Sequence, residues 1–510
     1  MKLRYLVVAV AVVNFSNTLV AQEAVDKGGV LEEIVVTVQK RNASIQSVPA
    51  TVIAFDESLL ASRNVVDLRD LQGILPNTIV GEDAIGLELS IRGVSNGAGA
   101  AGDSAIALHT DGVYTSSLNI LFYDMQRVET VYGPQGTLYG RNATGGALNA
   151  VTNEPDATEF YGNIEQTFGN YSRNLTKGMI NVPIIEDTLA IRLAGLIEER
   201  DGYTANPISG SNSGKIDGRS SARFSVSYQP TDSLSIVFRA TKFMLDSVNG
   251  DSTVPSLQEA FDSETNTVLA PTSVSLAELT ATQINAINND PWTFPRVDEG
   301  KISLDQMSYS VNVEWDFDRM ALTYIGGINN LDSGSSNGGL VVSTSTFGDI
   351  RENEFDESSH EFRLSSNSDG NFTWLVGLFT YKSERTGNVF VDFNDGGFVE
   401  FLNVDTQLEK ATSDAIFTSL NYKLTDKIKL SAGARYSEDE KQRKETIDTK
   451  LVFLPFPIPF TNDNQKDFDS TDWAFGVDYQ ISLDNLLYLS TSSGYKAGGL
   501  NSASAGLPTF

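Results

Sequence analysis

The chain has 510 residues, of which 66 are acidic and 37 basic, so its formal net charge is −29. This balance argues against nucleic acid as a partner, because binding to phosphates needs clustered Lys and Arg side chains. There is no cysteine, so an exported chain of this size needs a large core or a closed sheet in place of disulfides.

The first residues have the order of a secretory signal. The basic start MKLR precedes the apolar run YLVVAVAVV, and LVA stands before Gln22. That run is shorter than the roughly 20 residues that a membrane-spanning helix needs. We therefore predict a signal peptide over residues 1–21, removed after Ala21. No later stretch approaches 18 consecutive apolar residues, so no transmembrane helix is expected.

Residues 22–47 contain a short β-branched stretch, Ile34-Val35-Val36-Thr37-Val38. Such a stretch suits β-augmentation, in which an extended peptide adds a strand to the exposed sheet edge of a partner. The alternative is an ordinary first strand of the domain that follows.

Residues 48–157 have the pattern of a small mixed α/β domain. Asp56 is placed to cap a short helix, and Asn64 is placed to cap a second helix that ends at Gly73 and Pro76. Strand-like stretches surround these helices, at 47–55, 87–94, 105–114 and 127–133.

The stretch from Arg127 to Thr152, RVETVYGPQGTLYGRNATGGALNAVT, is rich in glycine. A Walker loop needs a lysine, yet none occurs between Lys40 and Lys177, and the dinucleotide pattern GxGxxG is missing. We expect these glycines to serve tight turns and close approach to an enclosing wall, where side chains do not fit.

From residue 158 onward the pattern has period two. In one stretch Ala222, Phe224, Val226 and Tyr228 alternate with polar residues, as amphipathic antiparallel strands require. Short turns alternate with long connections, which favours a transmembrane barrel with tight turns on one side and long loops on the other. The alternative is a soluble multi-stranded barrel or propeller. The expected long connections are 200–217, 247–300, 332–354, 385–410 and 439–466.

About thirteen strands are expected in 158–510. A single-chain bacterial barrel needs an even number of strands, and plugged transporters have about 22. The final stretch GYKAGGLNSASAGLPTF lacks alternation. We therefore predict a mostly β fold in which a small α/β domain lies inside an incomplete antiparallel transmembrane β-barrel.

Several motifs together resemble the TonB-dependent outer-membrane receptors. LEEIVVTVQKR (31–41) resembles the TonB box, and DGVY (111–114) and the glycine-rich segment to residue 155 resemble plug signatures. SSHEFRLSS (358–366), LSAGARYSEDEK (430–441) and GYKAGG (494–499) resemble barrel segments. The resemblance implies a plug at 48–157, a barrel portion at 158–510, and a location in the outer membrane with the N-terminus in the periplasm.

The resemblance also implies a function and partners. It implies energy-coupled uptake of a scarce external substrate, most often an iron–siderophore complex, with vitamins and glycans as alternatives. TonB is expected to bind Glu33, Ile34, Val35, Val36, Thr37 and Val38. No signalling domain fits between Ala21 and this box.

Members of this family hold the plug by arginines that face glutamates on the barrel wall. Carried over, this latch comprises Arg92, Arg127, Glu129, Arg141 and Glu361, with Glu361 as the wall partner. Breaking a buried pair of this kind costs about 3–5 kcal/mol, against about 0–1 for a surface pair.

Catalysis is not expected. The two histidines, His109 and His360, lie far apart in the sequence and no cysteine accompanies them, so neither a zinc site nor a Ser-His-Asp triad is favoured. We predict no catalytic residue, metal or cofactor. The competing hypotheses are a passive porin, a barrel enzyme and a truncated, non-functional receptor fragment.

Overall fold

The computed structural model describes residues 35–500, with gaps at 39, 42, 84–85, 96–103, 207–209, most of 249–298, 343–344, 368–369, 395–398, 452 and 483–484. The predicted signal peptide, Glu33 and Ile34 lie outside the described residues. The side chain of Val35 is likewise not described.

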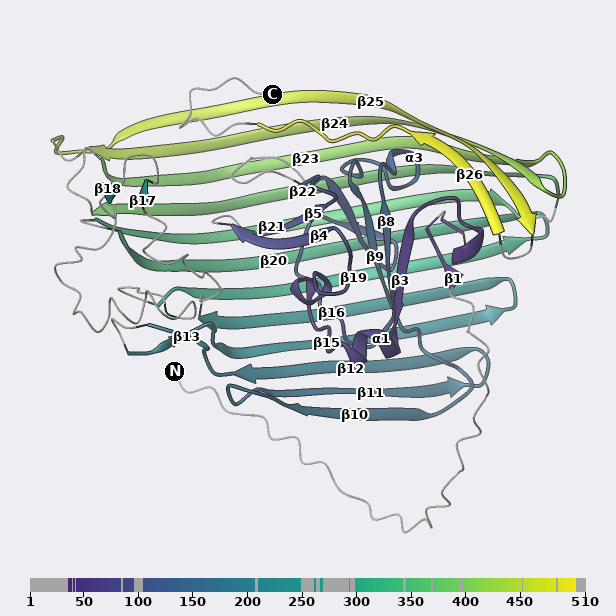
Figure 1. The fold of residues 1–510 in the computed structure, drawn as a ribbon, viewed down its shortest axis with the longest axis horizontal. Coiled ribbons are helices and arrows are strands. Elements are labelled where there is room, and N and C mark those ends of the chain that lie inside the picture. The colour runs from purple at the N-terminus through teal and green to yellow at the C-terminus, as the bar shows by residue number, and fades with distance from the viewer. Residues whose placement is uncertain are drawn as a thin grey trace, which may run out of the picture.

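One antiparallel sheet of 13 strands dominates the fold, in agreement with the expected strand number (Figure 1). Its strands follow one another in chain order, and each pairs with the next. They are β10 (Tyr161–Phe168), β11 (Asn174–Ile185), β12 (Leu189–Arg200), β15 (Ile216–Thr231), β16 (Leu234–Val248), β19 (Lys301–Phe317), β20 (Met320–Val342), β21 (Ser345–Ser366), β22 (Phe372–Asn394), β23 (Val399–Lys423), β24 (Ile428–Leu451), β25 (Ile458–Ser482) and β26 (Asn485–Ser492). The short hairpins β13 (Thr204–Ala205) with β14 (Asn212–Ser213) and β17 (Phe261–Asp262) with β18 (Thr267–Val268) lie in the connections.

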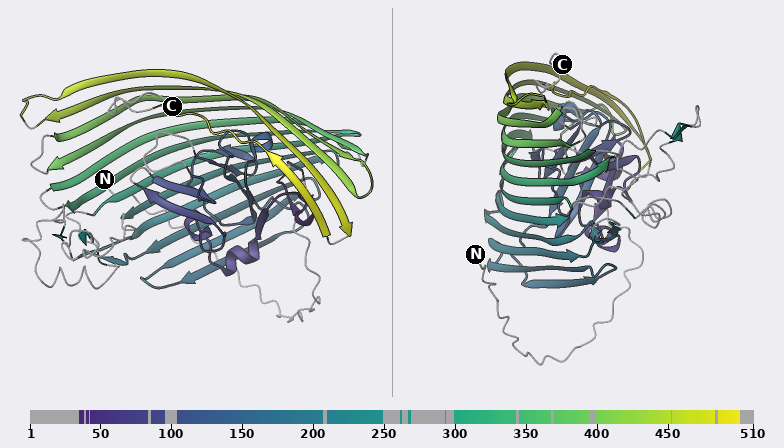
Figure 2. Two further views of the ribbon diagram at one scale, coloured as in Figure 1. Left: turned by 45° about the horizontal axis from the view of Figure 1, so that its top comes forward. Right: turned by 90° about the vertical axis from the view of Figure 1, so that its left-hand side faces the viewer.

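The sheet is strongly curved but does not close. Its outermost strands, β10 and β26, each pair with one neighbour only and not with each other. The wall bends around the N-terminal domain on one side and leaves the other side open (Figure 2). The prediction of an incomplete barrel is therefore confirmed.

The two ends of the sheet differ. Tight turns join strands at one end, hereafter the turn end, and the other end, the loop end, carries the remaining connections. The three connections expected at 332–354, 385–410 and 439–466 are mostly strand in the structure, so those boundaries were wrong. β22, β23 and β25 reach 23, 25 and 25 residues, whereas a tilted transmembrane strand needs only about 9–11. These ladders therefore continue well past the thickness of a bilayer.

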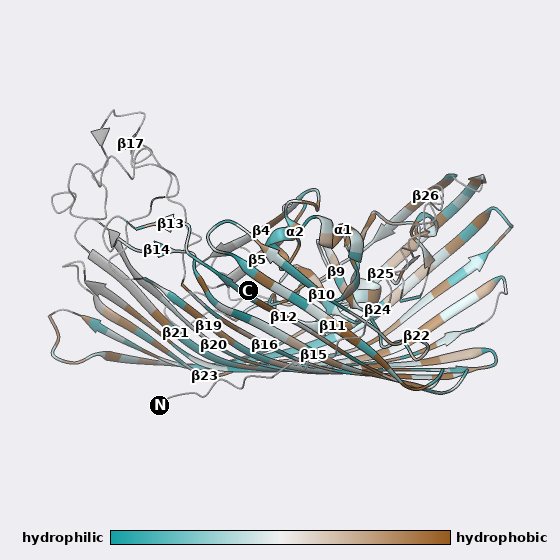
Figure 3. Ribbon diagram, turned by 90° about the horizontal axis from the view of Figure 1, so that it is seen from below, coloured by the Kyte–Doolittle hydropathy of each residue, from teal (hydrophilic) through white to brown (hydrophobic). Residues whose placement is uncertain are grey.

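The two faces of each strand differ in polarity, as the alternation predicted. In β15, Arg223 on the inner face is 6% exposed, whereas Phe224 beside it on the outer face is 39% exposed. Apolar and polar residues alternate visibly along the strands (Figure 3). Large apolar side chains turned away from the enclosed domain suit contact with lipid.

The outer apolar band stops at one level on neighbouring strands. Leu378, Ile416 and Tyr436 are register partners on β22, β23 and β24. Two residues farther toward the loop end, the same outer face carries Asp414 and Glu438.

The N-terminal domain, hereafter the plug, lies on the concave face of the sheet (Figures 1 and 2). Its five-stranded sheet has the order β3-β8-β9-β6-β7, with β6 and β9 parallel. The plug elements are β1 (Val35–Val36), β2 (Ala43–Ser44), the 3-10 turn η1 (Ile45–Ser47), β3 (Val52–Asp56), α1 (Glu57–Ser62), α2 (Leu68–Leu71), β4 (Thr78–Asp83), β5 (Gly86–Ile91), β6 (Ile106–Thr110), β7 (Val113–Thr115), β8 (Met125–Tyr132), α3 (Gly136–Tyr139) and β9 (Gly146–Thr152).

Both plug helices predicted from the sequence are present. The Asp56 side chain accepts a hydrogen bond from Leu59 N–H and caps α1 as expected. The second helix is capped by Asp67, in a capping box with Asp70, and not by Asn64. Asn64 instead adopts a left-handed backbone with φ +51°, which side-chain amides tolerate better than most residues. In the described part of the chain, no helix is long and apolar enough to cross a membrane.

The plug has its own apolar core. The leucines of α2 pack with residues from β5, β6 and β9, and all are at most 1% exposed. They include Leu68, Leu71, Leu89, Ile106, Leu108 and Leu148. The plug is therefore a folded unit, and its contacts with the wall combine buried ion pairs with two smaller apolar clusters. One cluster includes Tyr114, Tyr139, Phe379 and Phe417, and the other includes Tyr123, Leu175 and Leu196.

Candidate functional site: the plug and its contacts with the barrel wall

The box-like segment is docked on the plug at the turn end (Figure 1). β1 pairs with β2 in the register Val36↔Ala43. The side chains of Val36 and Val38 are 0% and 2% exposed and pack with Val48 and Val131. Burial of two valines on an apolar cluster stabilises this docked position by roughly 1.5–3 kcal/mol each. In this structure the described part of the segment is paired with β2 along one edge and anchored on the plug by Val36 and Val38.

Thr37 fixes the segment through a buried carboxylate. Its backbone N–H donates to Glu129 Oε1 at 2.9 Å, and its hydroxyl donates to Glu129 Oε2 at 2.9 Å. Glu129 is 0% exposed, and the Arg127 guanidinium pairs with it at 2.6 Å. Arg127 and Glu129 therefore face each other and the box, and their described contacts lie within the plug.

Arg92 does not join the wall either. Its side chain is exposed, its backbone is left-handed at φ +52°, and its guanidinium lies 5.0 Å from the ring centre of Tyr132, within the plug. The predicted contact between Arg92 and Glu361 is not made. Glycine follows at Gly93, so this IRG segment is a turn on the plug surface.

Glu361 does hold the plug, but through Lys40. The Lys40 Nζ lies 3.3 Å from Glu361 Oε1, and both side chains are 6% exposed. Arg363 also pairs with Glu361 at 3.2 Å and donates to the Lys40 carbonyl at 3.2 Å. Burial lowers the pKa of Lys40, and Glu361 opposes that shift. The wall strand β21 is thereby tied to the chain two residues after Val38.

Arg141 is the predicted latch arginine that contacts the wall. It is 2% exposed, and its Nη1 lies 3.0 Å from Asp439 Oδ1 on β24, with Tyr381 beneath its guanidinium. Neighbouring glycines permit this close approach. A Cβ on Gly140, which has φ +79°, would lie 2.6 Å from the Arg435 guanidinium. The expectation that these glycines serve turns and close contact with a wall is confirmed.

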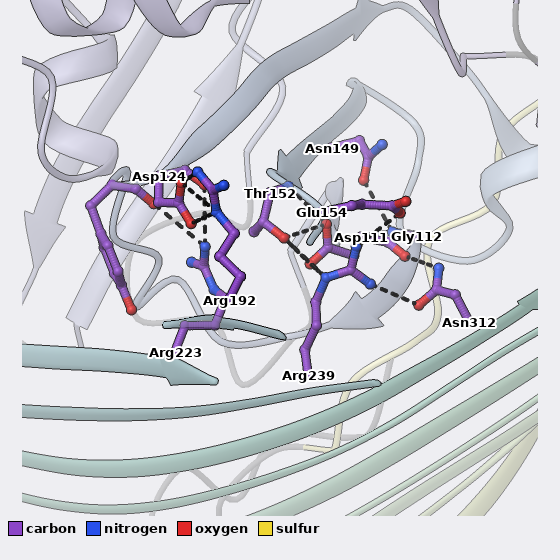
Figure 4. A network of polar contacts seen from close by, with 11 residues as sticks. Asp111, Gly112, Asp124, Asn149, Thr152, Glu154, Arg192, Arg223, Arg239 and Asn312 are labelled. Carbon is purple, nitrogen blue, oxygen red and sulfur yellow. Dashed lines mark hydrogen bonds and ion pairs between the residues drawn. The ribbon is translucent and has the colours of Figure 1, made fainter. Parts of the chain in front are cut away.

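On the opposite side of the plug the charges are reversed. Asp124 accepts two hydrogen bonds from Arg192 Nε, at 3.1 and 3.0 Å, and pairs with Arg192 Nη2 at 2.5 Å (Figure 4). Arg223 donates to the Asp124 carbonyl at 3.3 Å. Arg192 and Arg223 come from the inner faces of β12 and β15, and both are buried.

A second contact in which the plug supplies carboxylates and the wall supplies an arginine joins the ends of β6 and β9 to β16 (Figure 4). Arg239 lies 3.4 Å from Asp111 and 3.1 Å from Glu154. Asp111 also accepts from Thr152 N–H at 2.8 Å, so the carboxylate is held on both sides. A further pair, Arg219 with Asp67 at 3.2 Å, completes this group.

Among these pairs, the sign of the charge that the plug contributes depends on which strands of the wall it contacts. Toward β12, β15 and β16 the plug supplies carboxylates and the wall supplies arginines. Toward β21 and β24 the plug supplies Lys40 and Arg141, and the wall supplies carboxylates. The sequence analysis missed the first group. The available signal was arginine at polar-face positions in the middle of strands, as at Arg223.

Hydrogen bonds also connect the box to this interface. Asn149 Nδ2 donates to the Thr37 hydroxyl at 3.3 Å, and Gly112 N–H donates to Asn149 Oδ1 at 3.4 Å. Asp111, next to Gly112, is paired with Arg239 on the wall. The box is thus linked to β21 through Lys40 and to β16 through Asn149.

His109 is buried in the plug between two aromatic rings. Its ring makes edge contacts with Tyr114 and Tyr139 at centroid distances of 5.6 and 5.2 Å. Burial, reinforced by Lys40 and Arg435, lowers the pKa of His109 well below its usual value. His109 is therefore neutral at pH 7, and it packs between the two tyrosine rings. In the described part of the chain, no group of three or more His, Cys, Asp or Glu side chains is arranged to hold a metal ion.

A cavity lies between the plug segment 110–125 and strands β15 to β21, with about 120 Å³ open to water. Hydroxyl groups and the charged Asp111, Arg223, Arg239 and Glu357 line it. Glu357 is held from the plug side, where Thr115 and Ser116 donate to it at 2.5 and 3.0 Å. A space of this size with polar groups in its lining can hold water molecules.

The comparisons with known proteins match this architecture. Residues 44–147 match the TonB-dependent Receptor Plug Domain, and residues 243–509, more than half of the chain, match the model "TonB dependent receptor-like, beta-barrel". The chain is 24% identical over 483 residues to the pesticin receptor of Yersinia pestis, covering 92% of this chain and 64% of that protein.

Solved structures share the fold. The ferric yersiniabactin uptake receptor FyuA from Yersinia pestis matches with a TM-score of 0.74 at 20% identity, over 91% of this chain and 67% of that one. The ferric-catecholate import receptor Fiu from E. coli K12 matches with a TM-score of 0.68 at 14% identity, over 90% and 71%. Proteins of this family are receptors and transporters of the outer membrane. The chain belongs to the TonB-dependent receptor family.

Proposed function

We propose that this chain acts in energy-coupled uptake of an iron–siderophore complex across the outer membrane, with TonB bound by residues 33–38. The turn end then faces the periplasm and the loop end faces the exterior. The observation that carries the proposal is the position of Val36–Val38: the segment is docked at the turn end and tied to both plug and wall. Force applied to it is transmitted to Glu129 and, through Lys40, to Glu361.

The relatives support the substrate class. Two of the matching solved structures are an uptake receptor for ferric yersiniabactin and an import receptor for ferric catecholates. Iron-siderophore transport is therefore the best-supported activity for this fold and plug. Import of a vitamin or a glycan is the second candidate.

A proline in the box tests the role of TonB. Val36→Pro removes a backbone donor and fixes φ, so the segment cannot add to a partner's sheet. We expect uptake of radiolabelled ferric siderophore to fall to the level of a strain without TonB, while binding to energy-poisoned cells persists. Glu57→Pro is the matched control, because the first position of α1 accepts proline.

The outcomes separate the two parts of the proposal. Wild-type uptake by Val36→Pro would refute the assignment of the box. Cells that express the wild-type chain but bind no ferric siderophore, while a vitamin or glycan is taken up, would refute the substrate class.

A further inference from the structure

A groove of about 520 Å³ lies on the outer face of the sheet, near the turn end. Strand register places Ala432 of β24 between Leu420 of β23 and Phe475 of β25. Because alanine carries only a methyl group, it leaves a gap between these two larger side chains. Alternate residues of a strand share a face, and the lining side chains that share the outer face include Leu420, Tyr422, Leu430, Ala432, Phe475 and Val477.

One wall of the groove is aromatic. On β25 the ring centres of Trp473 and Phe475 lie 5.7 Å apart, and Phe475 is 56% exposed. A gap beside such a wall loses van der Waals contacts on one side. A flexible hydrocarbon chain that enters the gap restores those contacts, so the shape of the groove suits an acyl chain of the bilayer.

The groove lies within the leaflet at the turn end. Ala432 stands five residues after Lys427 in the turn, which is about 17 Å along a strand that is tilted in the membrane. One leaflet supplies about half of the roughly 30 Å of hydrocarbon. The end of the groove near Tyr422 therefore lies at the level of the lipid headgroups, where tyrosine side chains are favoured.

The turn below this end of the groove is basic. Residues 423–429, KLTDKIK, contain three lysines and one aspartate. Lys429 pairs with Asp478 at 2.9 Å, whereas Lys423 and Lys427 are exposed and take part in no ion pair within the described ranges. Register places Lys423 opposite Lys429, an arrangement that like-charge repulsion destabilises and that a nearby anion would relieve.

The other tight turns of this end have the opposite charge. The stretches 184–188, 230–233, 316–319, 367–371 and 482–485 each contain more acidic than basic residues. The basic turn is thus the one that joins β23 to β24, and these two strands supply Tyr422, Leu430 and Ala432 to the groove. An apolar groove and unpaired cations therefore occur together at one place on the sheet.

We propose that the groove and the turn below it bind one anionic phospholipid of the leaflet at the turn end. An acyl chain fills the groove over Ala432, and the phosphate group lies near Lys423 and Lys427. Basic residues at the edge of a membrane attract anionic headgroups in this way. The inference goes beyond the proposed uptake function and does not depend on the substrate.

The test reconstitutes the full chain in vesicles of phosphatidylethanolamine that contain a variable fraction of phosphatidylglycerol. One of the two lipids carries bromine on its acyl chains, which quenches the fluorescence of a tryptophan in contact with it. Trp473 reports on the groove because its ring packs beside Phe475. The charge variant is Lys423→Gln/Lys427→Gln, and the variant that fills the groove is Ala432→Leu.

Each variant has a matched control elsewhere on the sheet. Arg319→Gln removes a cation from another turn at the same end, where Asp316 and Asp318 accompany it. Ala240→Leu makes the same enlargement on the outer face of β16, where Ala240 is the register partner of Phe224 and lies outside the groove. Trp473→Phe removes the reporter itself.

We expect brominated phosphatidylglycerol to reach half-maximal quenching of the wild type at a mole fraction about 5- to 30-fold below that of brominated phosphatidylethanolamine. This is the effect of one or two lysines near an anionic headgroup. The charge variant, Ala432→Leu and Trp473→Phe should each lose this preference, and Arg319→Gln and Ala240→Leu should keep it. Quenching by brominated phosphatidylethanolamine, which reaches any tryptophan on the outer face, shows that each variant is inserted.

Equal quenching of the wild type by the two lipids would overturn the inference. A preference that survives in the charge variant, or that is lost equally in Arg319→Gln, would overturn the role of Lys423 and Lys427. A preference that survives in Ala432→Leu would overturn the groove as the site of the acyl chain. None of these measurements involves uptake, so failure of the proposed function is distinguishable from failure of the lipid site.

Discussion

The two sides of the plug are held by ion pairs of opposite sign. On one side Asp111 and Asp124 meet arginines from β12, β15 and β16, and on the other side Lys40 and Arg141 meet acids from β21 and β24. Such an arrangement fixes the rotation of the plug in the lumen, because a half turn would place like charges together. The difference also implies unequal responses to mutation and to pH, which four predictions address.

The largest effect is expected at Asp124. Asp124→Asn leaves the buried Arg192 without its bidentate partner, and breaking a buried pair costs about 3–5 kcal/mol. Hydrogen exchange of β6, β8 and β9 in detergent-solubilised protein measures the free energy of plug opening. Glu154→Gln is the matched control on the same side, because the Glu154 side chain is 57% exposed, and about 0–1 kcal/mol is expected. Equal effects of the two variants would contradict a buried latch on this side.

The basic side is tested by a double-mutant cycle at Arg141 and Asp439. Arg141→Gln removes the cation that pairs with the buried Asp439, and Asp439→Asn removes the carboxylate that pairs with Arg141. The double variant removes both charges of the pair, so it should recover about 0.5–3 kcal/mol relative to the sum of the single changes. Hydrogen exchange of the plug amides and the sensitivity of cells to large antibiotics measure how readily each variant's plug opens. Arg92→Glu is the control, since the exposed Arg92 contacts only plug residues among its described interactions. Strict additivity would show that the pair does not act as a unit.

Lowering the pH should destabilise the plug on the side where it supplies Lys40 and Arg141, because His109 is buried there. Its folded pKa lies below the unfolded value near 6.5, so the unfolded plug binds more protons as the pH falls. The contribution of neutral His109 is fully present above pH 6.5 and is lost below it, by up to about 1.4 kcal/mol per pH unit until the folded pKa is reached. Exchange of plug amides, corrected for intrinsic rates, should show this slope in the wild type.

His109→Gln removes the titrating group and should flatten the pH dependence between pH 6.5 and 5. Protonation here adds charge beside Lys40, Arg363 and Arg435, whereas the side at Asp124 has no histidine. An unchanged slope in His109→Gln would assign the acid response to carboxylates instead.

The smallest effect concerns the docked box. Thr37→Val removes the hydroxyl that bonds Glu129 and Asn149 but keeps the shape and the backbone donor. The docked state should lose about 1 kcal/mol, which raises the rate of protease cleavage at residues 33–38. Thr37→Ser keeps the hydroxyl and should match the wild type. Cleavage that is equally slow in Thr37→Val would show that Val36 and Val38 alone hold the segment.

Much of the fold was predictable because it depends on local pattern. Period-two alternation at 221–228 marked an amphipathic strand, and Asp56 before an apolar run marked a helix start. Asn64 was misassigned since two residues with capping side chains stand three positions apart, and only the backbone at φ +51° decides between them. Strand ends toward the loop end were misplaced because charged residues continue the ladder there.

The latch was predictable only in part. Arg141 and Glu361 do lie at the plug–wall interface, yet neither contacts the other. Lys40 and Glu361 are 321 positions apart in the sequence, and nothing local to either residue indicates the other. Arg127 followed the expected motif but faces Glu129, because both lie on β8 at positions two apart and so share a face.

The outer apolar band determines how deep the sheet sits in the bilayer. It ends at Leu378, Ile416 and Tyr436, and Asp414 and Glu438 follow two residues later. A sinking of the sheet by one such step, about 7 Å, would carry a row of carboxylates into hydrocarbon, and a rise by the same step would bring apolar side chains into water. Each penalty acts on several strands at once. The 23- to 25-residue strands therefore have one preferred depth in the bilayer. Their charged segments toward the loop end then extend beyond the lipid into water.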